Sequence, residues 1–361
     1  MAGRIVLFGA TGYTGRLVAR ALVARGAAPL LVARSRERVE ALSRELGGLP
    51  SAVADVERPQ TIRAVLQSGD ALVSTVGPFV RWGRPALQAA LDAGAHHIDS
   101  TGEPPFIRSV FEDHDAAAQD AGVGLLTAFG YDYVPGNLAG ALALREAGER
   151  AVSVDIGYFV SGGVQPSGGT RASAAGMLAE PAYAFAGGRL VTERTARRVH
   201  SFDGRPAVSV GGTEQFALPR VHPGLRDARV WLGWFGPASR PLQAISAATS
   251  LATRLPGVRG AIEATAGRFV KGSTGGPDAA TRAPGRSFIV AVASDADGAP
   301  LSTVRLEGDN PYDFTGAMLA WGAMAVAGGA LRGTGALGPV DAFGLDALAA
   351  GVAEAGIARR G

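Results

Sequence analysis

The chain has 361 residues and a mass of 36.7 kDa, with 47% hydrophobic and 19% charged residues. This is about twice the length of an ordinary domain, so we expect one large domain or two interlocked ones with ample apolar material for a core. Cysteine is absent, which excludes disulfides, zinc–thiolate sites and thiol nucleophiles. The net charge is only +3 and adjacent arginine pairs are few, so we expect no nucleic-acid partner.

Strand and helix signals alternate from residue 4 to residue 130. Short hydrophobic runs predict strands at 4–8, 29–33, 52–55, 71–76, 97–100 and 123–129. Segments with helical spacing lie between them, at 15–25, 37–46, 59–67, 84–93 and 105–121. Strands that alternate with helices in this way predict an α/β fold, a doubly wound parallel Rossmann sheet over residues 1–134.

The pattern changes after residue 134. Strand-like runs occur at 152–161, 194–202, 214–218, 230–235 and 287–293, and helical segments at 171–185 and 242–254. Strands with few crossover helices predict a second α+β domain, with a mostly antiparallel sheet, over residues 135–308.

The last segment, residues 309–361, contains an alanine- and glycine-rich helix after Pro311, which we expect to return to the Rossmann domain. Its charge-free stretch at 315–331 is shorter than the ~20 strongly apolar residues of a membrane span, so we expect no integral membrane segment. The N-terminus shows no signal-peptide pattern, and we expect a cytoplasmic protein.

The strongest motif joins the first predicted strand to the first predicted helix. Three glycines are each separated by two residues in the run Gly9, Ala10, Thr11, Gly12, Tyr13, Thr14 and Gly15. Glycines allow a tight turn and a close approach of the backbone to a pyrophosphate, whose charge the helix N-terminal amides receive. The motif predicts a dinucleotide site at these residues, with a bare turn as the alternative.

The end of the second strand decides between the two nicotinamide cofactors. An acid there would bind the ribose 2′-hydroxyl of NAD, but this chain has Arg34, Ser35 and Arg36. Arg34 can stack on adenine and pair with a 2′-phosphate, while Ser35 and Arg36 supply further donors. A solvated helix face explains Arg36 equally well. The predicted cofactor is NADP(H).

Further residues follow the later strands, where ligands bind in parallel sheets. Asp55 and Val56 follow the third strand and are expected beside the adenine. The loop after the fourth strand is expected beside the ribose and nicotinamide, and the loop after the fifth borders the same site; the cofactor-binding candidates there are Thr75, Val76, Gly77, Pro78, Phe79, Thr101 and Gly102.

Three residues are candidates for catalysis. Tyr131 and Asp132 follow the sixth strand, where a proton donor could reach both cofactor and substrate. The alternatives are that Tyr131 packs at the domain junction and Asp132 caps the next helix. Glu103 is a third candidate, or else a first-turn acid before Pro104 and Pro105. The histidines lack metal-ligand spacing, so we expect no metal.

Short-chain dehydrogenases share similar glycine turns but activate their substrate with a Tyr-x-x-x-Lys pair. Lys271 is the single lysine of this chain, and the residue four positions before it is Gly267. That pair is therefore impossible here, which excludes this class as catalysts. Its non-enzymatic relatives, which bind NADP as sensors or regulators, stay open as a hypothesis of a different class.

Taken together, four segments resemble the saccharopine dehydrogenase-like NADP-binding superfamily, and within it most of all the actinobacterial trans-acting enoyl reductases. The segments are the glycine turn, the Val-Gly-Pro-Phe loop at 76–79, the Asp-Ser-Thr-Gly-Glu stretch at 99–103 and the Gly-Tyr-Asp-Tyr-Val-Pro run at 130–135. A Ser-Gly-Gly-Thr element at 167–170 also matches. It makes Ser167, Gly169 and Thr170 candidates for holding a substrate carbonyl or carboxylate, and plain capping of a helix explains Ser167 and Thr170 equally well.

The resemblance implies a Rossmann domain followed by an α/β substrate domain, and NADPH-dependent reduction of unsaturated acyl or imine substrates. We favour reduction of a conjugated C=C in a lipid- or polyketide-type intermediate, with imine or iminium reduction as the alternative. The substrate is expected to be a small molecule or bound to a carrier, and a homodimer is compatible with the sequence.

Overall fold

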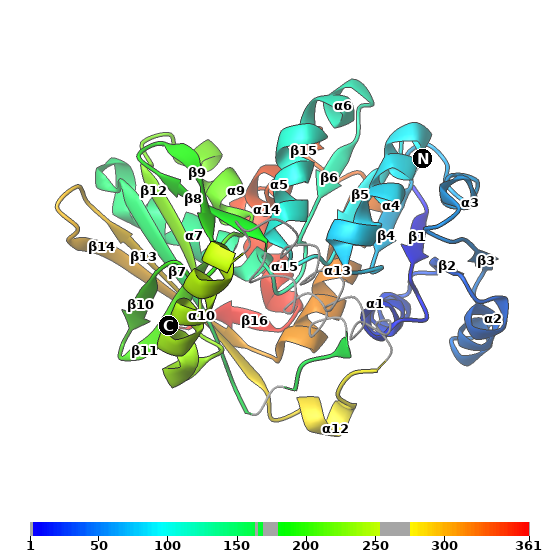
Figure 1. The fold of residues 1–361 in the computed structure, drawn as a ribbon. Helices are drawn as coiled ribbons and strands as arrows, with labels where there is room; N and C mark the ends of the chain where they lie inside the picture. The colour runs from blue at the N-terminus through cyan, green and yellow to red at the C-terminus, as the bar shows by residue number, and fades with distance from the viewer. Residues whose placement is uncertain (1–2, 163–164, 169–179, 253–274, 361) are drawn as a thin grey trace. The chain divides into compact units, whose positions relative to one another are not determined.

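The computed structural model describes residues 3–162, 165–168, 180–252 and 275–360 (Figure 1). It divides into two compact units. The first comprises Met1–Val134 and Tyr312–Gly356, and the second comprises Pro135–Pro311 and Ile357–Gly361. The units are described separately below.

A parallel sheet forms the centre of the first unit. Among the described residues it has seven strands in the order β15-β6-β5-β4-β1-β2-β3, and all neighbours run parallel. The strands are β1 (Ile5–Phe8), β2 (Leu30–Ala33), β3 (Ser51–Val53), β4 (Ala71–Ser74), β5 (His96–Asp99), β6 (Gly124–Leu126) and β15 (Gly335–Ala336). This confirms the predicted doubly wound Rossmann sheet, whose strand order reverses between β1 and β4.

Helices connect these strands. They are α1 (Tyr13–Ala24), α2 (Arg36–Glu45), α3 (Pro59–Arg63), α4 (Phe79–Ala93), α5 (Pro104–Asp113) and α6 (Asp115–Asp120), followed after the second unit by α13 (Pro311–Ala327), α14 (Pro339–Phe343) and α15 (Leu345–Glu354). In α1 the residues Val18, Ala19 and Leu22 recur at helical spacing and are all buried. The amphipathic spacing therefore seats the helix against the sheet.

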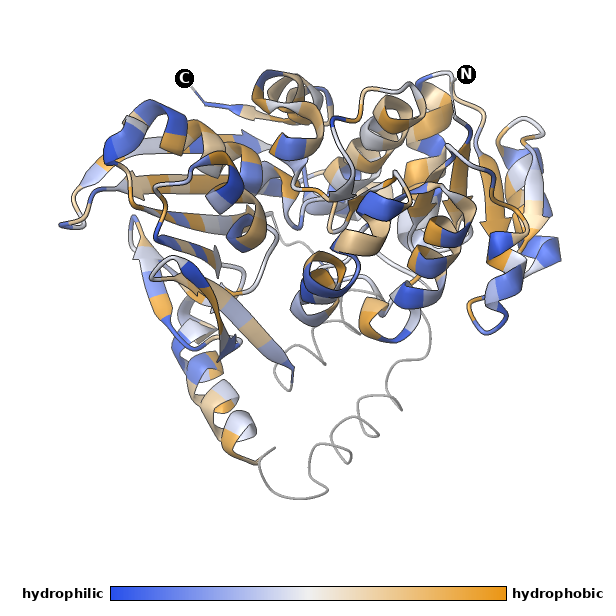
Figure 2. Cartoon of the chain, turned by 90° about the horizontal axis from the view of Figure 1, so that it is seen from above, coloured by the Kyte–Doolittle hydropathy of each residue, from blue (hydrophilic) through white to orange (hydrophobic). Residues whose placement is uncertain are grey.

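The central strands β1, β2 and β4 are mostly hydrophobic, as expected for a parallel sheet with helices on its two faces (Figure 2). Val6, Phe8, Val32 and Leu72 are buried in one core cluster. The C-terminal segment completes this core: the ring of Trp321 on α13 lies 6.5 Å from that of Phe129. The predicted return helix is thus part of the first unit. Within the described residues, no helix combines the length and hydrophobicity that crossing a membrane requires.

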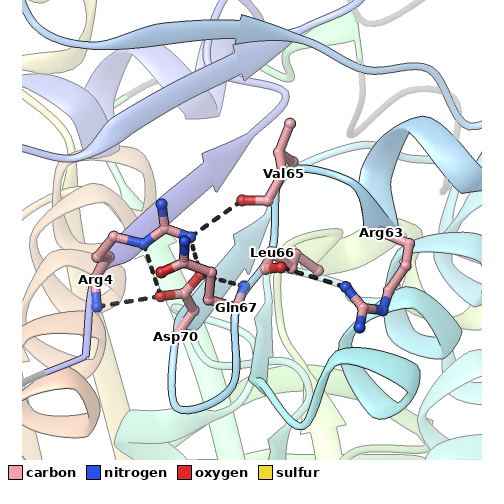
Figure 3. A network of polar contacts seen from close by, with 6 residues as sticks. All are labelled: Arg4, Arg63, Val65, Leu66, Gln67 and Asp70. Atoms are coloured by element: carbon pink, nitrogen blue, oxygen red, sulfur yellow. Dashed lines mark hydrogen bonds and ion pairs between the residues drawn. The ribbon is translucent and has the colours of Figure 1, made fainter.

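A network of polar contacts joins β1 and β4 at their amino ends (Figure 3). The buried carboxylate of Asp70 accepts hydrogen bonds from Arg4 Nη2 at 2.6 Å and Arg4 Nε at 3.0 Å. It also accepts from the backbone amides of Arg4 at 3.3 Å and Gln67 at 2.8 Å. Asp70 therefore ties the start of the two central strands together, at the sheet edge opposite the strand ends where ligands bind.

The second unit is built on a mixed sheet, which has nine strands among the residues that the structure describes. Its main path runs β10-β11-β12-β7-β13-β14-β16, and β8 and β9 extend it from β12. The strands are β7 (Ser153–Ser161), β8 (Pro181–Ala186), β9 (Arg189–Arg194), β10 (Val199–Phe202), β11 (Arg205–Val210), β12 (Asp227–Leu232), β13 (Arg286–Ser294), β14 (Pro300–Gly308) and β16 (Ile357–Arg359). The β12–β7 pair is parallel and the other pairs are antiparallel, which confirms a mostly antiparallel sheet.

Helices of the second unit are α7 (Val134–Ala147), α9 (Glu214–Val221), α10 (Ser239–Ala252) and α12 (Ala279–Arg282), with 3₁₀ turns η1 (Gly148–Arg150) and η2 (Gly236–Ala238). Gly140 of α7 lets this helix approach the sheet, because a Cβ there would lie 2.7 Å from Leu218 and 3.0 Å from Ile156. A separate core cluster lies on the sheet itself, formed by Phe159, Phe202, Ala207, Trp231 and Val290.

Two sequence predictions in this unit are wrong. Residues 214–218 were expected as a strand but form the start of α9. Gln215 explains the difference, because its amide side chain bonds both Gly212 N and Val210 O and closes the backbone into the first helical turn. Residues 181–185 were expected in a helix but belong to β8, which pairs with β9.

The last strand of the chain does not belong to the first unit. Residues 309–361 were predicted to pack on the Rossmann domain, but β16 pairs antiparallel with β14 and groups with the second unit. Pairing with β14, burial of Ile357 and the ion pair of Arg359 with Glu146 hold this strand there, and these partners are distant in sequence.

Candidate cofactor and proton-donor site

The glycine turn leads from β1 into α1, as the motif predicts. Gly9 adopts φ +86°, a left-handed conformation that favours glycine, and a Cβ there would lie 2.7 Å from Thr75 Oγ1. The amides of Gly9 and Ala10 donate to Val32 O at 2.9 and 3.1 Å. At Gly15 a Cβ would overlap the Gly9 carbonyl. The turn therefore depends on glycine at both positions, and it fits the close backbone approach of a pyrophosphate.

The start of α1 offers amide donors. Gly12 is the N-cap residue of this twelve-residue helix and has no side chain that could cap the amides of the first turn. Thr11, Tyr13 and Thr14 are partly buried along the same turn. The ring of Tyr13 meets that of Tyr312 edge-on at 5.3 Å. These amides are the groups expected to receive phosphate oxygens.

The residues after β2 have separate positions. Arg34 is exposed directly after the strand, whose Val32 carbonyl holds the glycine turn. Ser35 is the N-cap of α2, where its Oγ accepts from Arg38 N at 3.4 Å. Arg36 faces Glu40 at 3.5 Å on the solvated side of α2. This geometry leaves Arg34 best placed for a 2′-phosphate.

The loops after β3 and β4 border the same edge of the sheet. Asp55 Oδ1 accepts from Glu57 N at 3.1 Å, and Val56 packs against the core cluster of the unit. Thr75 Oγ1 lies within donating distance of Phe8 O and Gly9 O, at 3.2 and 3.3 Å. Thr75 thus joins the end of β4 to the glycine turn.

The rest of the β4 loop leads into α4. Val76 also packs on Gly9, where a Cβ would lie 2.8 Å from Val76 Cγ2. The Gly77–Pro78 peptide bond is cis, and the buried ring of Phe79 begins α4. All the candidates after β4 therefore lie on a single turn beside the glycine motif.

Glu103 lies after β5 and caps a helix other than its own. Its Oε1 accepts from Phe79 N at 3.0 Å and its Oε2 accepts from Val80 N at 2.8 Å. The carboxylate therefore satisfies amides in the first turn of α4, where a negative charge is favourable. Thr101 Oγ1 accepts from Glu103 N at 3.1 Å, which orders the loop that contains Gly102.

Asp132 lies against this loop. A Cβ on Gly102 would lie 2.9 Å from Asp132 Oδ2, so the carboxyl lies close to the Gly102 backbone. The residue keeps a small accessible surface, but burial of its carboxyl raises the pKa from 3.8 to about 7. A carboxyl that holds its proton near neutral pH is suited to general acid catalysis.

Tyr131 precedes Asp132 in the sequence, and its side chain is almost fully buried. Its ring meets Phe314 edge-on with centroids 6.4 Å apart, and its amide donates to Thr315 Oγ1 at 3.0 Å. These contacts correspond to the packing role that was left open for Tyr131. Its catalytic role stays a prediction.

Sequence reasoning missed Asp99, the last residue of β5. Its Oδ1 accepts from Thr101 N at 2.9 Å and from Ala128 N at 3.0 Å, and His97 Nε2 lies 3.3 Å from Oδ2. An acid at a strand end followed by Ser-Thr-Gly is the available signal, because aspartate at such a position bonds the amide two residues on. The bond to Ala128 has no local signal.

The substrate candidates lie in the second unit or outside the described residues. Ser167 is buried, and the neighbouring Gly168 N donates to Gly275 O at 3.0 Å. Gly169 and Thr170 lie outside the residues that the structure describes. Their role as substrate contacts stays a prediction.

Comparison with known proteins bears on the first unit directly. Residues 9–123 match the sequence model of a family described as NAD(P)H-binding. The first unit carries an NAD(P)H-binding domain. This confirms the predicted nicotinamide dinucleotide cofactor, while the individual contacts of the NAD(P)H-binding domain stay predictions.

Curated relatives match the chain over part of its length. A Mycobacterium tuberculosis protein whose name includes the words trans-acting enoyl reductase is 38% identical over 141 residues, covering 37% of this chain and 34% of the relative. A trans-acting enoyl reductase of Mycobacterium ulcerans is 35% identical over 151 residues, covering 40% of this chain and 36% of the relative. The matched region thus spans about a third of each relative's length.

The fold can be compared with a solved structure that matches nearly the whole chain. Saccharopine dehydrogenase (L-Glu forming) from Saccharomyces cerevisiae superposes with a TM-score of 0.60 at 13% identity and covers 99% of both chains. At this identity the match shows a shared fold. The two resemblances inferred from the loop motifs are therefore confirmed, one in sequence and one in fold.

Proposed function

We propose that this protein is an NADPH-dependent reductase that transfers hydride to a conjugated C=C bond of a lipid- or polyketide-type intermediate. The observation that carries the proposal is the position of the Asp132 carboxyl, which lies against Gly102 in the loop after β5 of an NAD(P)H-binding domain, where burial raises its pKa to about 7. Reduction of a double bond requires one hydride and one proton, and the first unit offers a site for each.

The cofactor would be held by the turn after β1 and the end of β2. The amides at the start of α1 would receive the pyrophosphate, and Arg34 would pair with the 2′-phosphate of NADPH. The absence of an acid at the end of β2 favours NADPH over NADH. When bound, NADPH supplies the hydride.

Asp132 would deliver the proton from its carboxyl. The neutral carboxyl is the donating form, and a raised pKa keeps it neutral up to about pH 7. Both oxygens of Glu103 are occupied as acceptors of backbone amides, so we assign Glu103 to positioning rather than proton transfer. Tyr131 is retained as a second candidate donor.

The names of the curated relatives support the enoyl assignment. Hydride addition to an enoyl group places charge on the carbonyl oxygen, and a proton donor such as Asp132 would neutralise it. The word "trans-acting" in those names favours a carrier-bound substrate over a free small molecule. The expected homodimer and cytoplasmic location stay predictions.

A turnover assay with two acceptors tests the proposal. Purified protein is mixed with NADPH and either an α,β-unsaturated acyl thioester or a cyclic imine, and NADPH oxidation is followed by absorbance. We expect oxidation with the thioester, and a kcat reduced about 100-fold or more in Asp132→Asn. The matched control Asp120→Asn, an exposed aspartate on α6, should retain wild-type kcat.

The other outcomes separate the alternatives. Oxidation with the imine alone would replace the enoyl assignment by imine reduction, the alternative suggested by the saccharopine dehydrogenase fold. NADPH fluorescence that shows binding, with oxidation by neither acceptor, would support a non-catalytic NADP-binding regulator and contradict the proposal.

A further inference from the structure

The carboxylate of Asp99 joins two loops that are distant in sequence. Asp99 is fully buried, and its Oδ1 accepts from Thr101 N in the loop after β5 and from Ala128 N in the loop after β6. Its backbone carbonyl accepts from Phe129 N at 2.7 Å. His97, also fully buried, contacts the second carboxylate oxygen at 3.3 Å. Asp99 therefore fixes the separation of these two strand ends.

Glu103 extends this connection to a third loop. Its carboxylate holds Phe79 N and Val80 N at the start of α4, and its own amide donates to Thr101 Oγ1. Hydrogen bonds from backbone amides to a buried carboxylate are among the stronger ones in proteins. The loops after β4, β5 and β6 are thus tied together by two carboxylates.

Asp132 belongs to the third of these loops. The loop starts at Ala128, which adopts φ +56°, and Tyr133 N donates back to Ala128 O at 2.7 Å. The hydrogen bond from the Ala128 amide to Asp99 therefore fixes the start of the loop that contains Asp132. At the other side, the Asp132 carboxyl lies against Gly102, between Thr101 and Glu103.

We propose that Asp99 and Glu103 are positioning residues that hold the Asp132 carboxyl against Gly102 at the carboxyl ends of β4, β5 and β6. The proposal rests on the proposed function, in which Asp132 is the proton donor. Neither residue donates the proton itself, since their oxygens are engaged with backbone amides. They act by fixing the position of the Asp132 carboxyl.

Asp70 provides a matched control within the same sheet. It is also a buried carboxylate that accepts backbone amides at a strand end, those of Arg4 and Gln67. It lies before β4, at the amino ends of the strands. A loss of stability alone should therefore appear in Asp70→Ala and Asp99→Ala alike, whereas a positioning effect should appear only in Asp99→Ala.

The test is the titration of Asp132, observed by ¹³C NMR of carboxyl-labelled full-length protein and assigned with Asp132→Asn. In Asp99→Ala the amides of Thr101 and Ala128 lose their acceptor, water gains access to the Asp132 carboxyl, and its midpoint should fall by about one pH unit or more. Asp70→Ala should leave the midpoint unchanged. Asp99→Asn keeps an acceptor oxygen for both amides, so the titration midpoint of Asp132 should stay close to its wild-type value.

Glu103→Gln provides a second variant where Asp99→Ala fails to fold. The carboxamide nitrogen cannot accept a hydrogen bond, so one amide of α4 loses its partner and the Asp132 midpoint should fall in the same direction. An unchanged midpoint in Glu103→Gln and in every folded Asp99 variant, or an equal shift in Asp70→Ala, would overturn the proposal.

Kinetics give a separate readout. We expect a kcat at least tenfold lower in Asp99→Ala than in the wild type, and a kcat close to that of the wild type in folded Asp70→Ala, because Asp70 lies at the amino ends of the strands. If the wild-type protein reduces neither acceptor, the proposed function fails, whereas the NMR titration still decides whether Asp99 positions Asp132. The two failures are therefore distinguishable.

Discussion

Replacing Asp132 with asparagine should change how the stability of the protein depends on pH. Burial raises the pKa of this carboxyl from 3.8 to about 7, so the folded protein holds a proton that the unfolded chain releases between these values. A raised pKa in the folded state means that stability is fully present below about pH 4 and is lost as the pH rises through about 7. Asparagine does not titrate and removes this loss.

The size of the effect follows from the two pKa values. Each pKa unit corresponds to about 1.4 kcal/mol, so the whole shift amounts to about 4 kcal/mol at high pH. Between pH 5 and pH 8 the part still to be lost is about 3 kcal/mol. The free energy of unfolding of the wild type should therefore fall by about 3 kcal/mol more than that of Asp132→Asn over this interval.

Urea denaturation followed by tryptophan fluorescence measures the difference. Trp82 and Trp321 report on the first unit, and the comparison of the two proteins at each pH cancels the other titrating groups. The exposed aspartate variant Asp120→Asn should follow the wild type. Equal pH slopes for wild type and Asp132→Asn would refute the burial of a proton at Asp132, and with it the basis for proton donation.

Three further substitutions test the cofactor site and the sheet. Gly9→Ala should weaken NADPH binding at least tenfold in a fluorescence titration, because φ at this residue is +86° and the Cβ would lie 2.7 Å from Thr75 Oγ1. Binding as tight as that of the wild type would contradict the turn geometry. Arg34→Ala should raise the NADPH Kd about tenfold or more and leave the NADH Kd nearly unchanged, since a charge-assisted bond to the 2′-phosphate is lost. An equal rise in both Kd values would argue against this contact. Asp70→Asn should cost roughly 1–3 kcal/mol in urea denaturation with unchanged NADPH binding, because the Arg4 bonds weaken at the amino ends of the strands; a change in Kd would show that the two sheet edges are coupled.

Much of the parallel sheet was predictable because β1, β2 and β4 are short hydrophobic runs, each followed by a segment with helical spacing, whereas the two-residue strand β15 (Gly335–Ala336) was not predicted. Leu7, Leu31 and Leu72 lie in such runs and are fully buried. In the second unit the local signals are weaker. The run Glu-Gln-Phe-Ala-Leu at 214–218 is compatible with a strand or a helix, and the bonds of Gln215 to Gly212 and Val210 decide for the helix.

The candidate site likewise has one part that local sequence signals predict and another that they do not. The glycine turn is local, so its spacing identifies it directly. The network that surrounds Asp132 depends on pairs far apart in the chain, such as Asp99 and Ala128, separated by 29 residues, or Glu103 and Phe79, separated by 24. Asp99 in the sequence is one aspartate among many. Its function as an acceptor for two loops emerges only when β5 and β6 lie side by side.

The pairing of β15 with β6 has a consequence for the synthesis of the chain. The NAD(P)H-binding domain needs Gly335 and Ala336 at the edge of its sheet, and it needs Trp321 and Phe343 against Phe129. All the residues of the second unit except its last few are made between Val134 and Tyr312. The ribosome therefore releases Met1–Val134, the larger part of the first unit, long before the C-terminal segment Tyr312–Gly356. Until α13 and β15 emerge, the edge of β6 and the Phe129 ring stay uncovered, and a fragment that stops at Val134 should aggregate rather than fold.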